Sequence, residues 1–194
     1  DAAVQPGRLP GLQSPVTVTF DGYGWPHIRG SSITDVVRVQ GYLQARDRIF
    51  EMELFRRNAS GTLAEIAGTV SPGLVDGDIN ARVIGYRRTA QQIWDGTMPG
   101  DERDLLTAFS EGVTAYIREL RAGTASLPPG SNLLPVEAIA DWTPVDSLAV
   151  VRLQHGVQSL DFSDIYRSNL LRLVAETFGA ADPGSPRYAR RAII

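Results

Sequence analysis

The sequence has 194 residues, a formal net charge of −3 and no cysteine. This length is enough for one domain with a hydrophobic core, and the acidic balance argues against a nucleic acid as partner. Disulfides, thiolate nucleophiles and cysteine-based zinc sites are excluded. We expect one unit over residues 1–194, with residues 1–15 as an extended arm and residues 179–194 as a tail. The first residue is Asp1 rather than Met, so we expect a processed or trimmed chain. No apolar run approaches the ~18 residues of a membrane helix, and no membrane insertion is expected.

A β-hairpin is predicted near the N-terminus. The stretch VTVTF at Val16–Phe20 alternates apolar residues with threonine, which is typical of a strand. Residues Asp21–Pro26 hold two glycines and a proline and favour a turn. His27 and Ile28 then continue as a second strand.

A long helix is predicted from Ile33 to about Asn58, with Ser32 or Thr34 as its cap. Apolar residues recur at spacings of three and four mixed with neighbours, so the helix is expected to be buried on more than one side. Its dense charges include Glu53 and Arg57, an opposite-signed pair at a spacing of four. This combination indicates ion pairs docked against something large.

Five further helices are predicted. Asp101 or Asp104 can start one of them, and Thr143 caps another because Pro144 fits the first helical position. Gly156 and the residues after it mark an end or a kink of that helix. The expected ranges are 62–68, 78–94, 105–120, 143 to about 156, and 165–178, the last of them amphipathic.

Groups that could carry chemistry are sparse. His27 and His155 are both interpreted as structural histidines rather than catalytic bases. Asp161 and Asp164, with the serines around them, make an oxygen-rich patch, for which a helix N-cap is favoured over a metal contact on spacing alone. The sequence holds no phosphate-binding loop, no G-x-S-x-G elbow and no H-E-x-x-H. The chain therefore does not look complete as an enzyme.

Four blocks of sequence carry a resemblance to a known family. They read DGYGWPHI at Asp21–Ile28, GYLQARDRIFEMELFRR at Gly41–Arg57, GTLAEIAG at Gly61–Gly68 and WTPVD at Trp142–Asp146. Their order and spacing are similar to those in the α chain of the penicillin acylase (penicillin amidase) family. The match spans most of residues 21–146.

The resemblance implies an N-terminal nucleophile hydrolase that is made as one precursor and cut into a smaller α chain and a larger β chain. The nucleophile is then the N-terminal Ser of the β chain, with its own α-amino group as base, and no catalytic residue lies on this chain. The implied fold class is α+β: a mostly helical chain with a short N-terminal β-hairpin, packed on an αββα core that the β chain completes. The long helix would pack on the sheets of that chain in a large obligate interface.

The resemblance also implies a calcium contact and part of an acyl pocket. Asp164 matches a carboxylate that completes a calcium site otherwise built by the β chain, where better-known members carry Glu; the shorter Asp makes water-mediated ligation an alternative. No organic cofactor is implied. Two glutamines near the pocket would indicate a more polar acyl group, although both lying on the surface is an equal alternative. The residues placed near the pocket are Gln154, Val157, Gln158, Leu160 and Phe162.

The implied substrates are N-acylated small molecules: β-lactam amides, acyl-homoserine lactones, lipopeptides or N-acyl amino acids. The resemblance also implies an exported bacterial protein, either periplasmic or secreted. The rival reading is a non-catalytic small-molecule-binding or regulatory helical protein. The lack of catalytic groups favours this rival, whereas the four ordered blocks and the cost of exposing an apolar helix oppose it.

Overall fold

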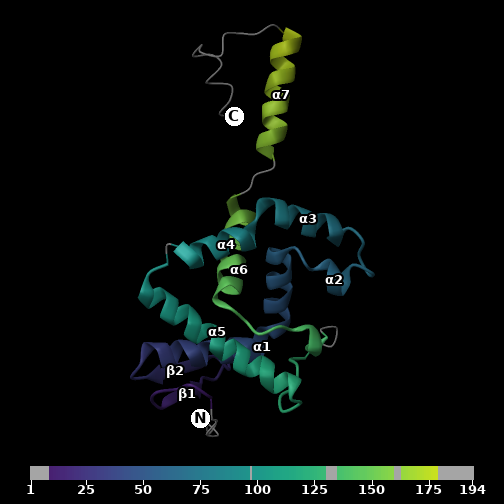
Figure 1. Cartoon of the computed structure of the whole chain (residues 1–194). Helices are drawn as coiled ribbons and strands as arrows, with labels where there is room; N and C mark the ends of the chain where they lie inside the picture. The colour runs from purple at the N-terminus through teal and green to yellow at the C-terminus, as the bar shows by residue number, and fades with distance from the viewer. Residues whose placement is uncertain (1–8, 97, 130–134, 160–162, 179–194) are drawn as a thin grey trace. The chain divides into compact units, whose positions relative to one another are not determined.

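A computed structural model describes residues 9–96, 98–129, 135–159 and 163–178. It confirms the predicted mostly helical chain with a short N-terminal β-hairpin (Figure 1). Contacts group the chain into residues 1–155 and residues 156–194, and each unit is described by itself. Among the described residues, no helix combines the length and apolar character needed to span a membrane. The elements are β1 (Val16–Phe20), β2 (Pro26–Gly30), α1 (Ile33–Ser60), α2 (Ala64–Ala67), α3 (Leu74–Ile84), α4 (Tyr86–Gly96), α5 (Gly100–Arg121), the short 3-10 helix η1 (Val136–Ala138), α6 (Pro144–Ser159) and α7 (Ser163–Phe178).

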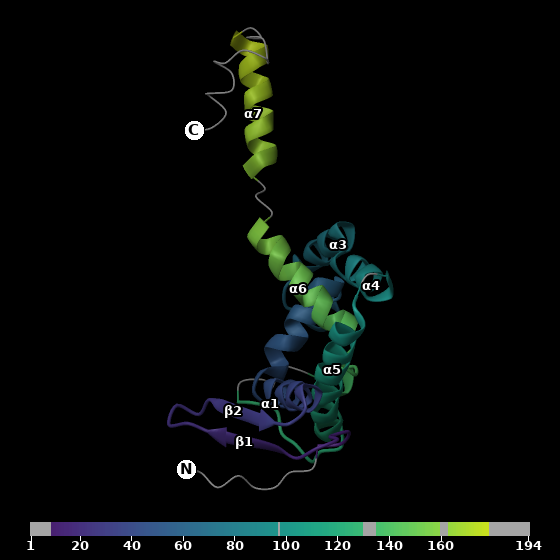
Figure 2. The same ribbon diagram turned by 90° about the vertical axis from the view of Figure 1, so that its left-hand side faces the viewer.

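The hairpin follows from its turn residues. Strands β1 and β2 pair antiparallel, with Val16 opposite Gly30 and Phe20 opposite Pro26. The Asp21 carboxylate accepts hydrogen bonds from the backbone N–H groups of Tyr23 (2.9 Å) and Trp25 (3.0 Å), which closes the turn. The bond from Trp25 is the main cause that holds the pKa of Asp21 below its usual value. Figure 2 shows the two strands beside the first part of α1.

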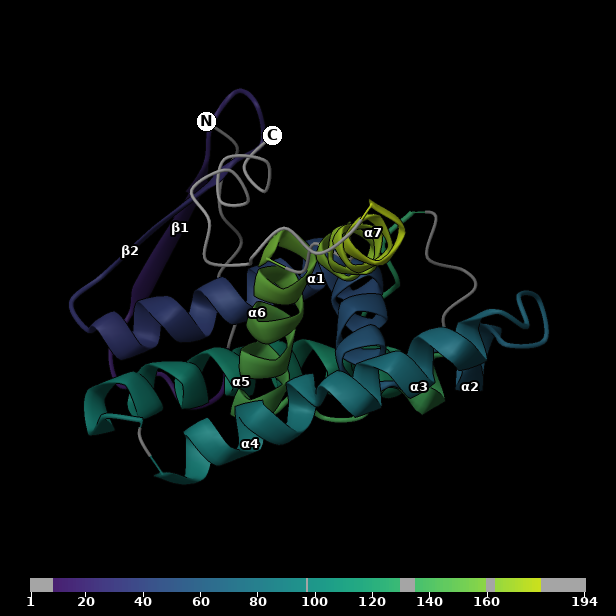
Figure 3. The same ribbon diagram turned by 90° about the horizontal axis from the view of Figure 1, so that it is seen from above.

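Helix α1 begins and ends at the residues that physical chemistry favours. The Ser32 hydroxyl accepts the backbone N–H of Asp35 (3.3 Å), and Gly61 ends the helix in the left-handed conformation at φ 66°. The helix bends at Arg48, whose φ of −139° and ψ of 20° are not helical (Figure 3). The sequence did not predict this bend.

Helices α1 and α5 lie side by side and form the main core. Ile49 of α1 and Val113 and Ile117 of α5 are fully buried there. Two glycines allow the close approach: a Cβ on Gly41 would meet the backbone of Phe109, and one on Gly112 would meet the backbone carbonyl of Arg38. Much of the apolar surface of α1 is therefore covered by α5 of the same chain. Packing of α1 on a second chain stays a prediction.

The prediction of a single helix over residues 78–94 was wrong. The structure has two helices, α3 and α4, which separate at Gly85, where φ is 81°. Only a residue without Cβ enters this conformation easily, and the change in direction brings Tyr86 and Ala90 of α4 onto a second core. That core also holds Ala59 of α1 and Ala149 of α6.

Two aspartates of the first unit, Asp35 and Asp78, accept hydrogen bonds from loop backbone and so hold the loops against the helices. Asp35, which is 2% exposed, accepts the backbone N–H groups of Gln13 (3.1 Å) and Ser14 (3.0 Å) and so ties the arm before β1 to α1. Asp78 of α3 accepts those of Leu63 (2.9 Å) and Ala64 (2.8 Å) and ties the start of α2 to α3. Each carboxylate satisfies two donors that would otherwise lack partners.

Helix α7 is the described element that lies wholly in the second unit. It confirms the predicted last helix, with its start at Ser163. Its apolar residues recur at spacings of three and four, which places them on one face. Those residues are exposed in this chain: Tyr166, Leu170, Leu173 and Val174.

Candidate functional site

A buried ion-pair network forms where three of the four sequence blocks meet. Glu53 of α1 is fully buried and accepts hydrogen bonds from Arg57 Nε (2.7 Å to Oε1) and from Arg56 Nη2 on its other oxygen. Arg57 also reaches Glu65 of α2 through Nη1 (3.1 Å to Oε2). The predicted pair Glu53–Arg57 is thus confirmed, and a second arginine shares the same carboxylate.

The same arginines hold the segment that leads into α6. Arg57 Nη2 donates to the carbonyl oxygen of Ala138 (2.9 Å), while Arg56 Nη1 donates to those of Ala140 (3.1 Å) and Asp141 (3.3 Å). The Arg56 guanidinium also lies over the Trp142 ring, 5.2 Å from its centroid. Residues about eighty positions apart are therefore joined by charge-assisted bonds.

The start of α6 is fixed by a capping arrangement. Asp146 Oδ2 accepts the backbone N–H (2.7 Å) and the hydroxyl (2.6 Å) of Thr143. Its other oxygen, Oδ1, accepts Nη1 of Arg87 from α4 (2.5 Å). The sequence predicted the cap and the favourable position of Asp146 at the helix N-terminus, but not the partner on α4. A hollow of about 400 Å³ lies between these residues and the network around Glu53.

These contacts fit a positioning role rather than a chemical one. Every oxygen of Glu53 and Asp146 is engaged by an arginine or a cap. The hollow does hold the Thr143 hydroxyl beside the Asp146 carboxylate, but this carboxylate is paired with Arg87 and also accepts the Thr143 backbone N–H, so it serves the helix start rather than proton transfer. Across the part of the chain that the structure describes, no group of three His, Cys, Asp or Glu side chains could hold a metal ion. The arrangement therefore sets the position and direction of α6.

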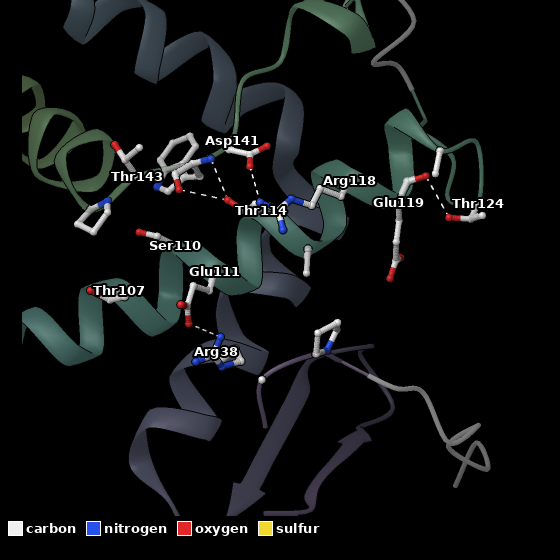
Figure 4. A pocket seen from close by; sticks show the side chains of 16 residues that line it. Arg38, Thr107, Ser110, Glu111, Thr114, Arg118, Glu119, Thr124, Asp141 and Thr143 are labelled. Atoms are coloured by element: carbon white, nitrogen blue, oxygen red, sulfur yellow. Dashed lines mark hydrogen bonds and ion pairs between the residues drawn. The ribbon is translucent and has the colours of Figure 1, made fainter. Parts of the chain in front are cut away.

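A second hollow, the α5 groove, runs along one face of α5 and has a volume of about 660 Å³ (Figure 4). Its charged walls are paired: Arg38 contacts Glu111, and Arg118 Nη2 lies 2.7 Å from Asp141 Oδ2. The hydrogen bond from Arg118 is the main cause that lowers the pKa of Asp141. The hydroxyl of Thr114 lies in the same wall and is bonded to the backbone of Trp142. The groove, too, assembles no catalytic pair.

The predicted pocket residues lie around the end of α6. Gln154, Val157 and Gln158 are exposed there, beyond Leu153, which is the last buried residue of the helix. The helix continues through Gly156 and ends at Ser159, within the stretch after Gly156 where its end was predicted. Leu160 and Phe162 lie outside the described residues. Asp164 is the second residue of α7, and its side chain is not described. The assignment of these residues to a pocket or a calcium site stays a prediction.

The two predicted structural histidines are both exposed. His27 Nε2 lies 3.2 Å from Asp21 Oδ2, so this ring has a hydrogen-bond partner in the hairpin turn. His155 lies near the end of α6. Neither contacts a Ser, Thr or Tyr hydroxyl in the described hydrogen bonds, and the assignment of both as structural histidines stays a prediction.

The fold of this chain is similar to that of a chain in a solved structure. It matches a thermostable penicillin G acylase from Alcaligenes faecalis with a TM-score of 0.70, covering 93% of this chain and 89% of that chain at 23% sequence identity. At this identity the match shows a shared fold.

The sequence comparisons then give the family. Residues 15–185 match the family described as Penicillin amidase, and the chain belongs to this family. It is 37% identical over 180 residues to the penicillin acylase 2 proenzyme of Pseudomonas sp. (strain SE83), covering 93% of this chain and 22% of that protein. It is also 29% identical over 170 residues to the acyl-homoserine lactone acylase QuiP of Pseudomonas fluorescens (strain Pf0-1), covering 88% of this chain and 20% of that protein. The chain spans about a fifth of the length of these curated relatives. The predicted resemblance is confirmed.

Proposed function

We propose that this chain is the smaller subunit of a two-chain amidohydrolase that cleaves the amide bond of N-acylated small molecules. The observation that carries the proposal is the 37% identity over 93% of the chain to a protein named a proenzyme. A proenzyme becomes active by being cut, and four fifths of that relative lies beyond the matched part. The larger subunit would come from the corresponding part of the same precursor.

The proposed nucleophile is the N-terminal Ser of the larger chain. An α-amino group has a pKa of roughly 7.7–8.0, so a useful fraction is neutral near pH 7.5 and can take the hydroxyl proton. The hydroxyl oxygen attacks the amide carbonyl, the amine passes its proton to the leaving nitrogen, and water then hydrolyses the acyl ester. In this scheme the present chain supplies no catalytic group and contributes scaffold and pocket.

The contribution to the pocket would come through α6. The network around Glu53 and the cap at Asp146 hold the start of this helix, and its far end presents Gln154, Val157 and Gln158 to the solvent. Their exposure leaves them available to a substrate or to the larger chain. We include Leu160 and Phe162 in the same pocket, and the two glutamines favour a polar acyl group.

The proposed substrates are β-lactam side-chain amides, N-acyl amino acids or acyl-homoserine lactones. The names of the relatives include penicillin acylases and acyl-homoserine lactone acylases, so the family holds both specificities. We also propose that the protein is exported, to the periplasm or to the medium.

The proposed calcium site involves Asp164. Calcium takes ~6–8 oxygen ligands, and the described residues offer no group of three acidic or imidazole side chains for it. The larger chain would have to supply most of the ligands. Titration of the two-chain protein with calcium chloride, followed by calorimetry, should show a site that Asp164→Ala weakens and that Asp161→Ala leaves unchanged. Equal binding by both variants would remove Asp164 from the site.

The decisive experiment is expression of the full precursor, followed by intact-mass analysis and N-terminal sequencing of the purified protein. We expect a second, larger chain that begins with Ser, and hydrolysis of at least one N-acyl substrate in a panel of three acyl classes. A 194-residue chain that is folded, monodisperse, alone and inactive would support the rival, a non-catalytic binding protein.

Variants then test the pocket. Gln154→Ala, Val157→Ala and Gln158→Ala should change the ratio of kcat/KM values between acyl donors. Gln92→Ala, at an exposed position of α4, is the matched control and should leave the ratio unchanged. If no pocket variant changes the ratio, these residues do not contact the acyl group.

A further inference from the structure

Helix α3 exposes an apolar stripe to the solvent. Val75, Ile79 and Val83 follow one another at a spacing of four, which places them on one side of the helix. Their exposed fractions are 49%, 52% and 72%. Helix α3 lies at the edge of the helical unit, beside α2 and α4 (Figure 3).

The inward side of the same helix is polar or small. Asp78 is 8% exposed and accepts the backbone N–H groups of Leu63 and Ala64, and Ala81 packs in the second core. Amphipathic helices of globular proteins show the opposite order, with apolar side chains inside and charge outside. The polarity of α3 is thus reversed relative to its own chain.

Polar contacts prevent the stripe from rotating inward. Arg82 Nε donates to the carbonyl oxygen of Gly61 (2.8 Å), and a Cβ on Gly61 would clash with the backbone of Asp78. Turning Ile79 toward the core would break this bond and both bonds to the Asp78 carboxylate. The outward direction of the stripe is therefore set by the structure.

The stripe has the composition of an interface. Its three residues are β-branched, which are poorer helix formers than the alanine, glutamate or lysine that suit a solvent-facing helix. Exposed polar residues flank it, with Arg82 on one side and Asp76 on the other. An apolar centre with a charged rim is the usual anatomy of a protein interface.

We propose that the α3 stripe is a docking surface for the larger chain of the same precursor. This inference rests on the proposed two-chain function. The part matched by this chain makes up only about a fifth of each curated relative, so a protein of their kind has further polypeptide large enough to cover the stripe within the same molecule. Contact there would bury the three side chains and leave Asp76 and Arg82 to pair at the rim.

The experiment uses the full precursor with Ile79→Glu and Val83→Glu combined. Both side chains are half exposed or more, so glutamates there can be accommodated by the unbound chain but not by an apolar interface. Gln92→Glu is the control, since it adds charge at an exposed position of α4. Ile79→Val is the conservative variant, because it keeps an apolar, β-branched side chain in the stripe. The readouts are native mass, the rate at which the two chains separate in mild urea, and amide exchange of α3.

We expect the wild type, Gln92→Glu and Ile79→Val to remain two-chain proteins, with α3 protected from exchange. The double glutamate variant should separate at least about tenfold faster and lose that protection. If the wild type is a two-chain acylase but the double variant separates at the same rate, the docking surface is wrong while the proposed function stands. If the purified wild type contains no second chain, both the docking surface and the proposed two-chain function are refuted. A complex of two copies of this chain that the glutamates disrupt would also overturn the proposal.

Discussion

Replacing Glu53 with Gln should destabilise the protein strongly, because this buried carboxylate lies between the guanidinium groups of Arg56, which is buried, and Arg57, which is partly buried. Its side chain is 1% exposed, and those of Arg56 and Arg57 are 8% and 12% exposed. A glutamine keeps the shape but offers one acceptor oxygen, and its NH₂ group faces an arginine donor.

The magnitude can be worked from the contacts. Breaking a buried ion pair by removing one partner costs about 3–5 kcal/mol. Both arginines keep carbonyl acceptors at residues 138, 140 and 141, so we expect the lower end, about 3 kcal/mol. For a chain of this size, that corresponds to a fall in Tm of roughly 6–12 °C.

The assay is urea and thermal unfolding of the purified protein, followed by far-UV circular dichroism. Glu51→Gln is the matched control, since Glu51 lies on the same helix, is half exposed and pairs with Arg48 at 3.5 Å. An exposed pair of this kind contributes about 0–1 kcal/mol. Equal midpoints for the two variants would refute the view that the network stabilises the fold.

Three further predictions concern packing and pH. Gly41→Ala should destabilise the protein by about 1–3 kcal/mol or more, because the new Cβ meets the backbone of α5. Gly77→Ala has open space around it and should stabilise α3 by roughly 0.5–1 kcal/mol. Chemical denaturation measures both changes. Burial, together with a hydrogen bond to the Glu119 carboxylate, raises the pKa of Tyr42 to about 12, whereas the unfolded chain has a value of ~10. The neutral phenol therefore contributes its full stabilisation below pH ~10. This stabilisation is lost as the pH rises toward 12. Ultraviolet titration of the wild type and Tyr42→Phe checks this, and ionisation of Tyr42 near pH 10 contradicts it. The pKa of Asp141 is lowered by Arg118, so its carboxylate stabilises the folded chain at pH values above 3.8, the pKa in the unfolded chain. This stabilisation is lost as the pH falls through the pKa in the folded chain. Asp141→Asn should therefore reduce the loss of stability between about pH 5 and pH 2, which acid unfolding measures.

Local signals in the sequence predicted the elements whose ends are set locally. The cap at Ser32, the alternation of Val16–Phe20 and the cap at Thr143, whose hydroxyl oxygen accepts the backbone N–H of Asp146 (3.4 Å), all act over a few residues, and the structure confirms each. The break at Gly85 was missed because apolar and charged residues continue across it at helical spacing. A glycine within such a pattern does not show whether its φ is positive.

The ion-pair network was predicted only where it is local. The spacing rule gave Glu53 with Arg57, but the burial of the pair and the contacts of Arg56 depend on a segment that lies more than eighty residues away. Distances of this kind are set by tertiary packing, which spacing along a helix does not encode. The pocket residues on α6 rest on the family resemblance, since nothing in their local pattern separates a pocket from an exposed helix end.

The hydrogen bonds of Asp78 and Arg56 join segments at very different separations along the chain, which bears on the order of folding. The partners of Asp78 lie 15 and 14 residues away, whereas the carbonyl partners of Arg56 lie 84 and 85 residues away. Closing a short loop loses less chain entropy, so contacts of low sequence separation tend to form first. We therefore expect the joint between α2 and α3 to form before α6 docks. Pulsed hydrogen exchange during refolding should protect Leu63 and Ala64 before Trp142, and simultaneous protection would show that the two regions fold as one.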